Sequence, residues 1–186
     1  MISHGNLIAN ATTLTHIWKF TAEDVLLHAL PIFHTHGLFV ASNVSLMAGA
    51  AMLYLPRFDA AEVLRLLPRA SVLMGVPTFY TRLLAQPGLN REAAAHMRLF
   101  ISGSAPLLAE THREFSLRTG HAILERYGMT ETNMLTSNPY EGERRPGSAG
   151  LALPDVELRI RDSAGQDLPA GEVGSIEVRG PNVFAG

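Results

Sequence analysis

The chain has 186 residues, of which 47% are hydrophobic and 17% are charged, and its formal net charge is −2 at pH 7. These values fit one ordinary globular domain with room for a piece of another, and the small charge gives no indication of a nucleic-acid partner. Without cysteine, disulfides, cysteine-ligated zinc and thiol catalysis are excluded, and without a long apolar run or a signal-peptide pattern we expect no membrane span and a cytoplasmic location.

Five short apolar runs predict β-strands in the first three quarters of the chain. Each run is nearly continuous in apolar character, which is typical of parallel strands that are covered on both faces. Each run also ends at glycine or proline, which closes a strand and begins a loop. The five runs are residues 24–31, 51–56, 71–77, 98–103 and 122–128.

Helical segments are expected between these strands. Residues 36–49 are apolar almost all round, which predicts a deeply buried helix. Residues 59–67 begin with Asp59 as a cap, 77–86 begin with Pro77, and 105–119 have Pro106 near the start and a glycine at the end. Alternation of this kind indicates an α/β fold with a doubly wound, mostly parallel sheet and flanking helices.

The pattern changes after about residue 140. A polar connector rich in glycine and proline comes first, and two alternating segments at 156–162 and 175–180 follow. Alternation predicts half-exposed antiparallel strands. We therefore divide the chain into an α/β subdomain, residues 1–143, and the start of a β-rich subdomain, residues 144–186.

The segment "YGMTET" lies where the fifth strand ends, and ligands of open parallel sheets bind beyond this edge. Tyr127 offers a ring for stacking, and Gly128 allows close approach of the backbone. Thr130 supplies a hydroxyl for a phosphate near an expected helix N-terminus, and Glu131 is a suitable ligand for Mg²⁺. The same residues also fit a plain helix start in which Thr130 is only the N-cap.

Three other segments contribute candidate residues at the same edge. "ISGSAPL" could form a backbone platform around Gly103 or an ordinary strand-to-helix turn, and it lacks the nucleophile elbow of a hydrolase. In "PIFHTHG", His34 and His36 favour a pocket lining over a metal site, because no third ligand stands nearby. Arg82 could reach the crevice and pair with a carboxylate, or lie on a solvated helix face.

Five segments together resemble the adenylate-forming enzymes, a family of acyl-CoA synthetases, luciferases and peptide-synthetase adenylation domains. "YGMTET" is similar to the core motif Y-G-x-T-E, and "ISGSAPL" to S-G-[GSA]-A-P-L. "LPIFHTHGL", "RRPGSAGLALPDVELRI" and "GEVGSIEVRGPNVFAG" resemble the acyl-pocket loop, the connector and the G-E-x-G-E segment. Within the family, the combination looks most like malonyl-CoA synthetases, with a medium- or long-chain acyl-CoA synthetase as the alternative.

The resemblance implies an acid–CoA ligase that joins a carboxylic acid to ATP·Mg²⁺ as an acyl-adenylate and then transfers the acyl group to coenzyme A. It implies that Tyr127 stacks on adenine, Thr130 contacts the α-phosphate, Glu131 helps to hold Mg²⁺ and His34 lies near the nascent carbonyl. The further implied nucleotide contacts are Ser102, Gly103, Ser104, Ala105, Glu125, Arg126, Gly128 and Met129. The implied acyl-pocket residues are His34, Thr35, Arg82, Ser102, Gly103 and Met129, with Arg82 on the distal carboxylate of a malonate-like acid.

The resemblance also implies that parts of the family's site lie outside these 186 residues. The phosphate loop is expected upstream of "ISHGNL", and the ribose-binding T-G-D segment and the small C-terminal domain are expected downstream of "NVFAG". We therefore expect a fragment that is inactive alone. A non-catalytic AMP-binding module and a truncated product without function are the rival hypotheses, and the sequence does not give the oligomeric state.

Overall fold

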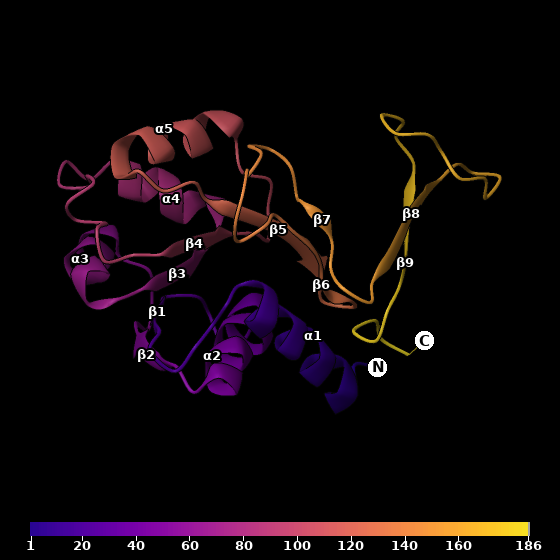
Figure 1. Ribbon diagram of the computed structural model, residues 1–186, viewed down its shortest axis with the longest axis horizontal. Helices are drawn as coiled ribbons and strands as arrows, with labels where there is room; N and C mark the ends of the chain where they lie inside the picture. Colours follow the sequence, from indigo (N-terminus) through magenta and orange to yellow (C-terminus); the bar gives the residue numbers. More distant parts are fainter. Residues whose placement is uncertain (186) are drawn as a thin grey trace.

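A computed structural model describes residues 1–185 as a sheet flanked by helices, together with a two-stranded ribbon (Figure 1). The strands are β1 (Val25–His28), β2 (Ala51–Tyr54), β3 (Val72–Gly75), β4 (Leu99–Ser102), β5 (Leu124–Met129), β6 (Asn133–Ser137), β7 (Leu151–Ala152), β8 (Glu157–Arg161) and β9 (Ser175–Arg179). The helices are α1 (His4–Ile17), the π-helix η1 (His36–Ser42), α2 (Asn43–Ala48), α3 (Ala60–Leu66), the 3₁₀ turn η2 (Leu67–Arg69), α4 (Pro77–Leu84) and α5 (Ala109–Thr119).

The main sheet has seven strands in the order β2-β1-β3-β4-β5-β6-β7. The strands from β2 to β5 pair in parallel, whereas β6 and β7 are antiparallel additions at one edge. All five strands predicted from apolar runs are present, and the α/β class is confirmed. Helices α3, α4 and α5 lie on one side of the sheet, and α1 and α2 lie on the other (Figure 1). The strand order reverses between β1 and β3, where such folds place a ligand crevice.

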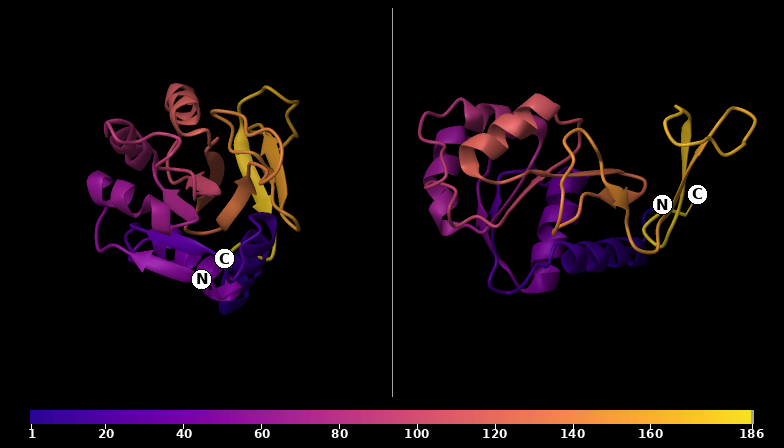
Figure 2. Two further views of the ribbon diagram at one scale, coloured as in Figure 1. Left: turned by 60° about the vertical axis from the view of Figure 1, so that its left-hand side comes forward. Right: turned by 45° about the horizontal axis from the view of Figure 1, so that its top comes forward.

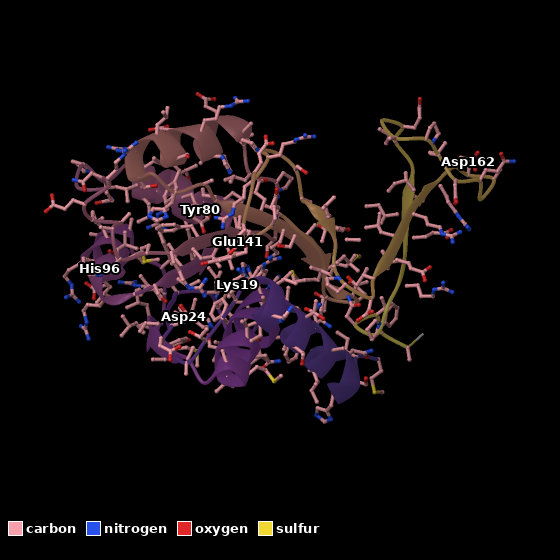
Figure 3. The ribbon with its side chains drawn as sticks, in the orientation of Figure 1. Lys19, Asp24, Tyr80, His96, Glu141 and Asp162 are labelled. Carbon is pink, nitrogen blue, oxygen red and sulfur yellow. The ribbon has the colours of Figure 1, made fainter. Side chains whose placement is uncertain are left out.

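Aromatic packing joins the sheet to the helices on one face. Phe115 of α5 meets Phe100 of β4 edge-on, with ring centroids 4.9 Å apart, and it contacts Tyr80 of α4 at 5.3 Å. Figure 3 labels Tyr80, whose hydroxyl donates to the Ile101 carbonyl at 2.5 Å. Because this buried hydroxyl has an acceptor, the hydrogen bond offsets its desolvation and the contact fixes α4 against β4.

Two predicted helices differ from expectation. The segment 36–49 is a π-helix followed by α2, and its burial is one-sided, since Leu46 and Met47 are 68% and 49% exposed. The prediction of all-round burial is therefore wrong. Helix α5 begins at Ala109, three residues after Pro106, because the chain first makes a turn in which Ser104 has φ = 68°. At α3 the predicted cap is confirmed, with Asp59 accepting from the Glu62 amide at 2.9 Å.

The segment after Tyr127 is a β-hairpin and not a helix. Strand β5 continues to Met129, turns through residues 130–132, and returns as β6 in antiparallel pairing. The predicted helix N-terminus at Thr130 is therefore wrong. Sequence favoured a helix because threonine and glutamate suit a first helical turn, but the run from Asn133 to Ser137 is fully buried and completes the sheet.

The ribbon of β8 and β9 stands apart from the helices, at the opposite end from α3 (Figure 2). Its tip carries Asp162, labelled in Figure 3. Strand β7, which precedes the ribbon, pairs with β6 of the main sheet. The division of the chain at residue 144 stays a prediction. Among the helices of residues 1–185, none has the length and apolar character that crossing a membrane requires.

Candidate active site

Two adjoining cavities lie at the carboxyl edge of the parallel strands. The first has a volume of about 370 Å³ and is lined by Ser102, Ser104, Ala105, Pro106, Leu107, Glu125, Arg126, Tyr127, Gly128, Gly147 and Ala149. The second has a volume of about 260 Å³ and is lined by His34, Thr35, His36, Ser104, Arg126, Gly128, Met129, Thr130, Glu131 and Met134. The shared residues Ser104, Arg126 and Gly128 form the boundary between the two cavities.

These cavities bring together almost all of the site residues that the sequence suggests. The loop after β1, the turn after β4 and the β5–β6 hairpin each supply part of the lining. Only Gly103 and Arg82 are absent from both linings. Convergence of three distant segments therefore follows from the parallel strands, whose carboxyl ends share one edge. The individual roles suggested for these residues stay predictions.

Arg126 is a buried guanidinium without a partner. Its side chain is 4% exposed, and its Nε and Nη2 atoms have no hydrogen-bond acceptor among the described residues. Burial lowers the pKa of Arg126 to about 9, so the group is still a cation at neutral pH. A buried cation without an anion is costly, and the donors of the guanidinium fork suit a carboxylate.

At two positions of the site, Gly103 and Gly128, a side chain larger than that of glycine would clash with its neighbours. A Cβ on Gly103 would lie 2.3 Å from Cζ of Arg126, so Gly103 gives the guanidinium its space. A Cβ on Gly128 would lie 2.1 Å from the carbonyl oxygen of Asn133, at the irregularity in the hairpin register. Gly128 is thus required by the hairpin itself, a reason that sequence reasoning did not include.

Sequence reasoning considered His36 only as a general pocket-lining residue beside His34, and the structure places it in the second cavity. The imidazole is 2% exposed, its Nδ1 lies 3.2 Å from Oγ of Ser104, and its Nε2 has no partner among the described residues. Burial, followed by the nearby charge of Arg126, holds the pKa of His36 well below its usual value. The signal available in sequence was its position two residues after His34 in "PIFHTHG".

The π-helix that begins at His36 is anchored from β1. The Gly37 carbonyl accepts a hydrogen bond from Ser42 Oγ at 2.9 Å and lies 3.0 Å from Nε2 of His28, the last residue of β1. A Cβ on Gly37 would lie 2.3 Å from the Pro31 carbonyl oxygen. These contacts fix the loop that presents His34, Thr35 and His36 to the cavity. π-Helical turns are frequent at functional sites.

The hairpin turn carries the exposed part of the site. Thr130 and Glu131 lie on its surface, and Oγ1 of Thr130 is 3.5 Å from Oγ1 of Thr35. Glu131 is an isolated carboxylate in this cavity: within residues 1–185 no three metal-binding side chains are grouped closely enough to hold an ion. Protein groups alone therefore do not form a metal cage.

Glu125 and Tyr127 line the first cavity from β5. The Glu125 carboxylate accepts from the Gly147 amide at 2.9 Å, and burial raises its pKa despite this hydrogen bond. Tyr127 is half-buried beside it. Together they give this cavity an aromatic face and a hydrogen-bond acceptor, which are suited to a nitrogen heterocycle.

Arg82 lies elsewhere, on α4. Its guanidinium packs over the Phe58 ring, 4.9 Å from the ring centroid, and its side chain is exposed. This position matches the second alternative that the sequence left open for Arg82, a place on the solvated face of a helix.

A mostly parallel α/β sheet with two cavities of mixed polar and apolar lining at its carboxyl edge is an arrangement that nucleotide-binding enzymes use. The model of the family "AMP-binding enzyme" matches residues 1–186, and the chain belongs to this family. The family resemblance read from the five sequence segments is therefore confirmed.

Among relatives, the mitochondrial malonate–CoA ligase ACSF3 of Mus musculus is 37% identical over 98% of this chain and 37% of its own length. The crystal structure of ATP-bound MatB from Rhodopseudomonas palustris is 65% identical with a TM-score of 0.98, over all of this chain and 37% of that one. A malonyl-CoA ligase in a ternary product complex with methylmalonyl-CoA and AMP is 41% identical with a TM-score of 0.90, over all of this chain and 41% of that one. The chain thus spans less than half the length of these relatives.

Proposed function

We propose that this chain forms part of an acid–CoA ligase whose acid is malonate or a close analogue. The observation that carries the substrate class is Arg126, a buried cation without an anion at the boundary of the two cavities. A second carboxylate on the acid would supply that anion, whereas a fatty acid would leave the charge unpaired. The similarity to malonate–CoA ligases and to MatB supports the same class.

The proposed reaction consists of two substitution steps, the first at the α-phosphorus of ATP and the second at the acyl carbon. A carboxylate oxygen of the acid attacks the α-phosphorus of ATP, the bond to the bridging oxygen breaks, and pyrophosphate leaves. The sulfur of coenzyme A then attacks the acyl carbon, the bond to the AMP oxygen breaks, and the thioester forms. The first step depends on alignment and on charge neutralisation more than on covalent help from the protein.

The nucleotide belongs in the first cavity under this proposal. Tyr127 would stack on adenine, and Glu125 and the Ser102–Ala105 segment would line the purine and ribose. The acid and the α-phosphate belong in the second cavity, with Thr130 on the phosphate and His34 beside the reacting carboxylate. Since Ser104, Arg126 and Gly128 border both cavities, the nucleotide and the acid would lie on either side of these residues.

Glu131 could hold Mg²⁺ only if the phosphates of the nucleotide supplied further ligands. A single exposed carboxylate is the typical protein share for Mg²⁺, which takes its other ligands from phosphates and water. When bound, the ion would offset negative charge on the phosphates as pyrophosphate leaves. Glu131 would hold this ion at the mouth of the second cavity.

The substrate class can be tested by segment exchange with MatB of Rhodopseudomonas palustris. Residues 1–186 replace the matching segment, and ATP–pyrophosphate exchange is measured with malonate and with butyrate, with the parent enzyme as control. We expect malonate to exceed butyrate at least about 100-fold in kcat/KM, because a polar pocket rejects an analogue that lacks its partner. Equal rates with both acids would overturn the substrate class.

Experiments on the 186-residue chain alone distinguish the proposed ligase fragment from the two rival hypotheses. We expect the 186-residue chain to bind AMP in isothermal titration and to show no useful ATP–pyrophosphate exchange. Binding without exchange in the chimera would favour the non-catalytic module. Absence of both AMP binding and exchange would favour a product without function.

A further inference from the structure

His36 links two walls of the candidate site. It begins the π-helix after β1, and its Nδ1 is 3.2 Å from Oγ of Ser104, in the turn after β4. The two residues are 68 positions apart. Ser104 holds φ = 68°, a left-handed conformation that is uncommon for serine. Strain of this kind is retained where it serves a specific geometry, and here it accompanies a hydroxyl placed at the imidazole.

The other nitrogen of His36 is unsatisfied. Nε2 is buried without a partner, as are Nε and Nη2 of Arg126 in the lining of the same cavity. Both guanidinium atoms are donors, so an anion would satisfy them. The imidazole joins them as a donor only if its proton is on Nε2, and that tautomer requires Nδ1 to accept the hydroxyl proton of Ser104.

We infer that Ser104 fixes His36 as the Nε2–H tautomer, and that this N–H acts with Arg126 to bind the distal carboxylate of the acid. The inference rests on the proposed function. It makes His36 a specificity-determining residue and Ser104 a positioning residue that acts through it. The unpaired groups of His36 and Arg126 would then all be donors, which favours a carboxylate over a methyl group and over an ammonium group.

The first test reads the tautomer directly and needs no substrate. Long-range ¹H–¹⁵N correlation spectra of the ¹⁵N-histidine-labelled chain distinguish a protonated Nε2 from a protonated Nδ1. We expect the Nε2–H pattern for His36 in the unsubstituted chain and a mixture of tautomers in Ser104→Ala. An Nδ1–H pattern, or an imidazole unaffected by Ser104→Ala, would overturn the inference.

The second test measures malonate binding in the presence of AMP, with butyrate as the comparison. His36→Phe removes the donor and is expected to weaken malonate binding about 10-fold or more, because the lost hydrogen bond has a charged acceptor. His36→Gln keeps an amide donor near the position of Nε2 and should restore much of that loss. Butyrate binding should be unchanged or stronger in both variants.

His121→Phe is the matched control, because this histidine is half-buried against Phe100 and lines neither cavity. It should not change the ratio of malonate to butyrate affinity. If His36→Phe binds malonate as the unsubstituted chain does, the ligand half of the inference is overturned. If the unsubstituted chain prefers butyrate or binds neither acid, the proposed substrate class fails instead, whatever the tautomer.

Discussion

The two edges of the parallel sheet each carry an arginine side chain, but only one of the two arginines is paired within the described part of the fold. At the amino edge, Arg98 donates to both carboxylate oxygens of Asp24 at 2.7 and 2.6 Å and to the backbone carbonyls of Trp18 and Lys19. At the carboxyl edge, Arg126 is more deeply buried and its Nε and Nη2 have no partner within residues 1–185. The first arginine joins the start of several strands, whereas the second is left for a ligand.

The Asp24 network shows what a satisfied charge does for the fold. Ser71 Oγ also donates to Asp24 at 2.7 Å, so the starts of β1, β3 and β4 meet at one carboxylate. Burial opposes ionisation of Asp24, but the hydrogen bonds from Arg98 and Ser71 prevail and lower its pKa. Nearby, Lys19 pairs with Glu141 of the connector, and the two are close in Figure 3. The charged groups at this edge are therefore satisfied by partners within the fold.

Replacing Arg98, the paired arginine, should have the largest effect on the free energy of unfolding. Arg98→Met leaves the buried Asp24 carboxylate without its cation, which should lower the free energy of unfolding by about 3 kcal/mol. Arg65→Met is the matched control, because its ion pair with Glu62 is exposed and such pairs contribute little to stability. Urea unfolding of both variants checks this. Equal losses would remove the distinction between the two kinds of arginine pair.

Replacing the unsatisfied arginine should have the opposite effect. Arg126→Met removes a buried uncompensated charge and should raise the free energy of unfolding by about 1–3 kcal/mol without ligand. The same change should weaken malonate binding about 100-fold, through loss of a charge-assisted pair. Arg82→Met, at the exposed site over Phe58, should leave stability nearly unchanged. If Arg82→Met costs more malonate affinity than Arg126→Met, the distal carboxylate belongs to Arg82.

Alkaline pH should bring the unsubstituted chain and Arg126→Met closer in stability. The folded-state pKa of Arg126 is about 9, and the ordinary value is 12.5, so above pH 9 only the unfolded chain keeps this proton. Stability linked to this group therefore rises with pH above 9, and at pH 10 the difference between the two proteins should shrink by about 1 kcal/mol. Denaturant unfolding at pH 8 and pH 10 measures it. A constant difference would show that Arg126 does not titrate in this range.

Gly103→Ala should have the smallest effect. The added methyl group meets the end of a flexible side chain, so Arg126 would move and the backbone would stay. We expect the free energy of unfolding to change by less than about 1 kcal/mol and malonate affinity to fall several-fold. Titration with malonate and thermal unfolding separate the two effects. A large loss of stability with unchanged affinity would mean that Gly103 serves the backbone and not the guanidinium.

The comparison of edges also explains which features the sequence could predict. Apolar runs closed by glycine or proline identified the five parallel strands, and a parallel sheet necessarily gathers their ends. Local pattern could not reveal that the Asp24–Arg98 pair spans 74 positions or that the His36–Ser104 contact spans 68. Such pairs depend on strand order, and none of these four residues carries a local signal of its partner.

The prediction of a helix after Tyr127 was wrong for a different reason. "TET" suits either a helix start or a tight turn, and only the burial of the next five residues decides between them. Likewise, the late start of α5 follows from a left-handed serine, a conformation with no compositional signature. It was thus easier to predict which residues line the two cavities than to predict the local backbone conformation that carries them.

The π-helix at His36–Ser42 gives the wall of the second cavity a length that can change. A π-turn is an α-turn that has absorbed one additional residue, so its length can change without shifting the strands on either side. Deleting one residue there would return the segment to ordinary helical spacing and rotate the imidazole by about 100° relative to α2. A single deletion in this segment would therefore reshape the second cavity from a loop, without changing the sequence of any strand of the parallel sheet.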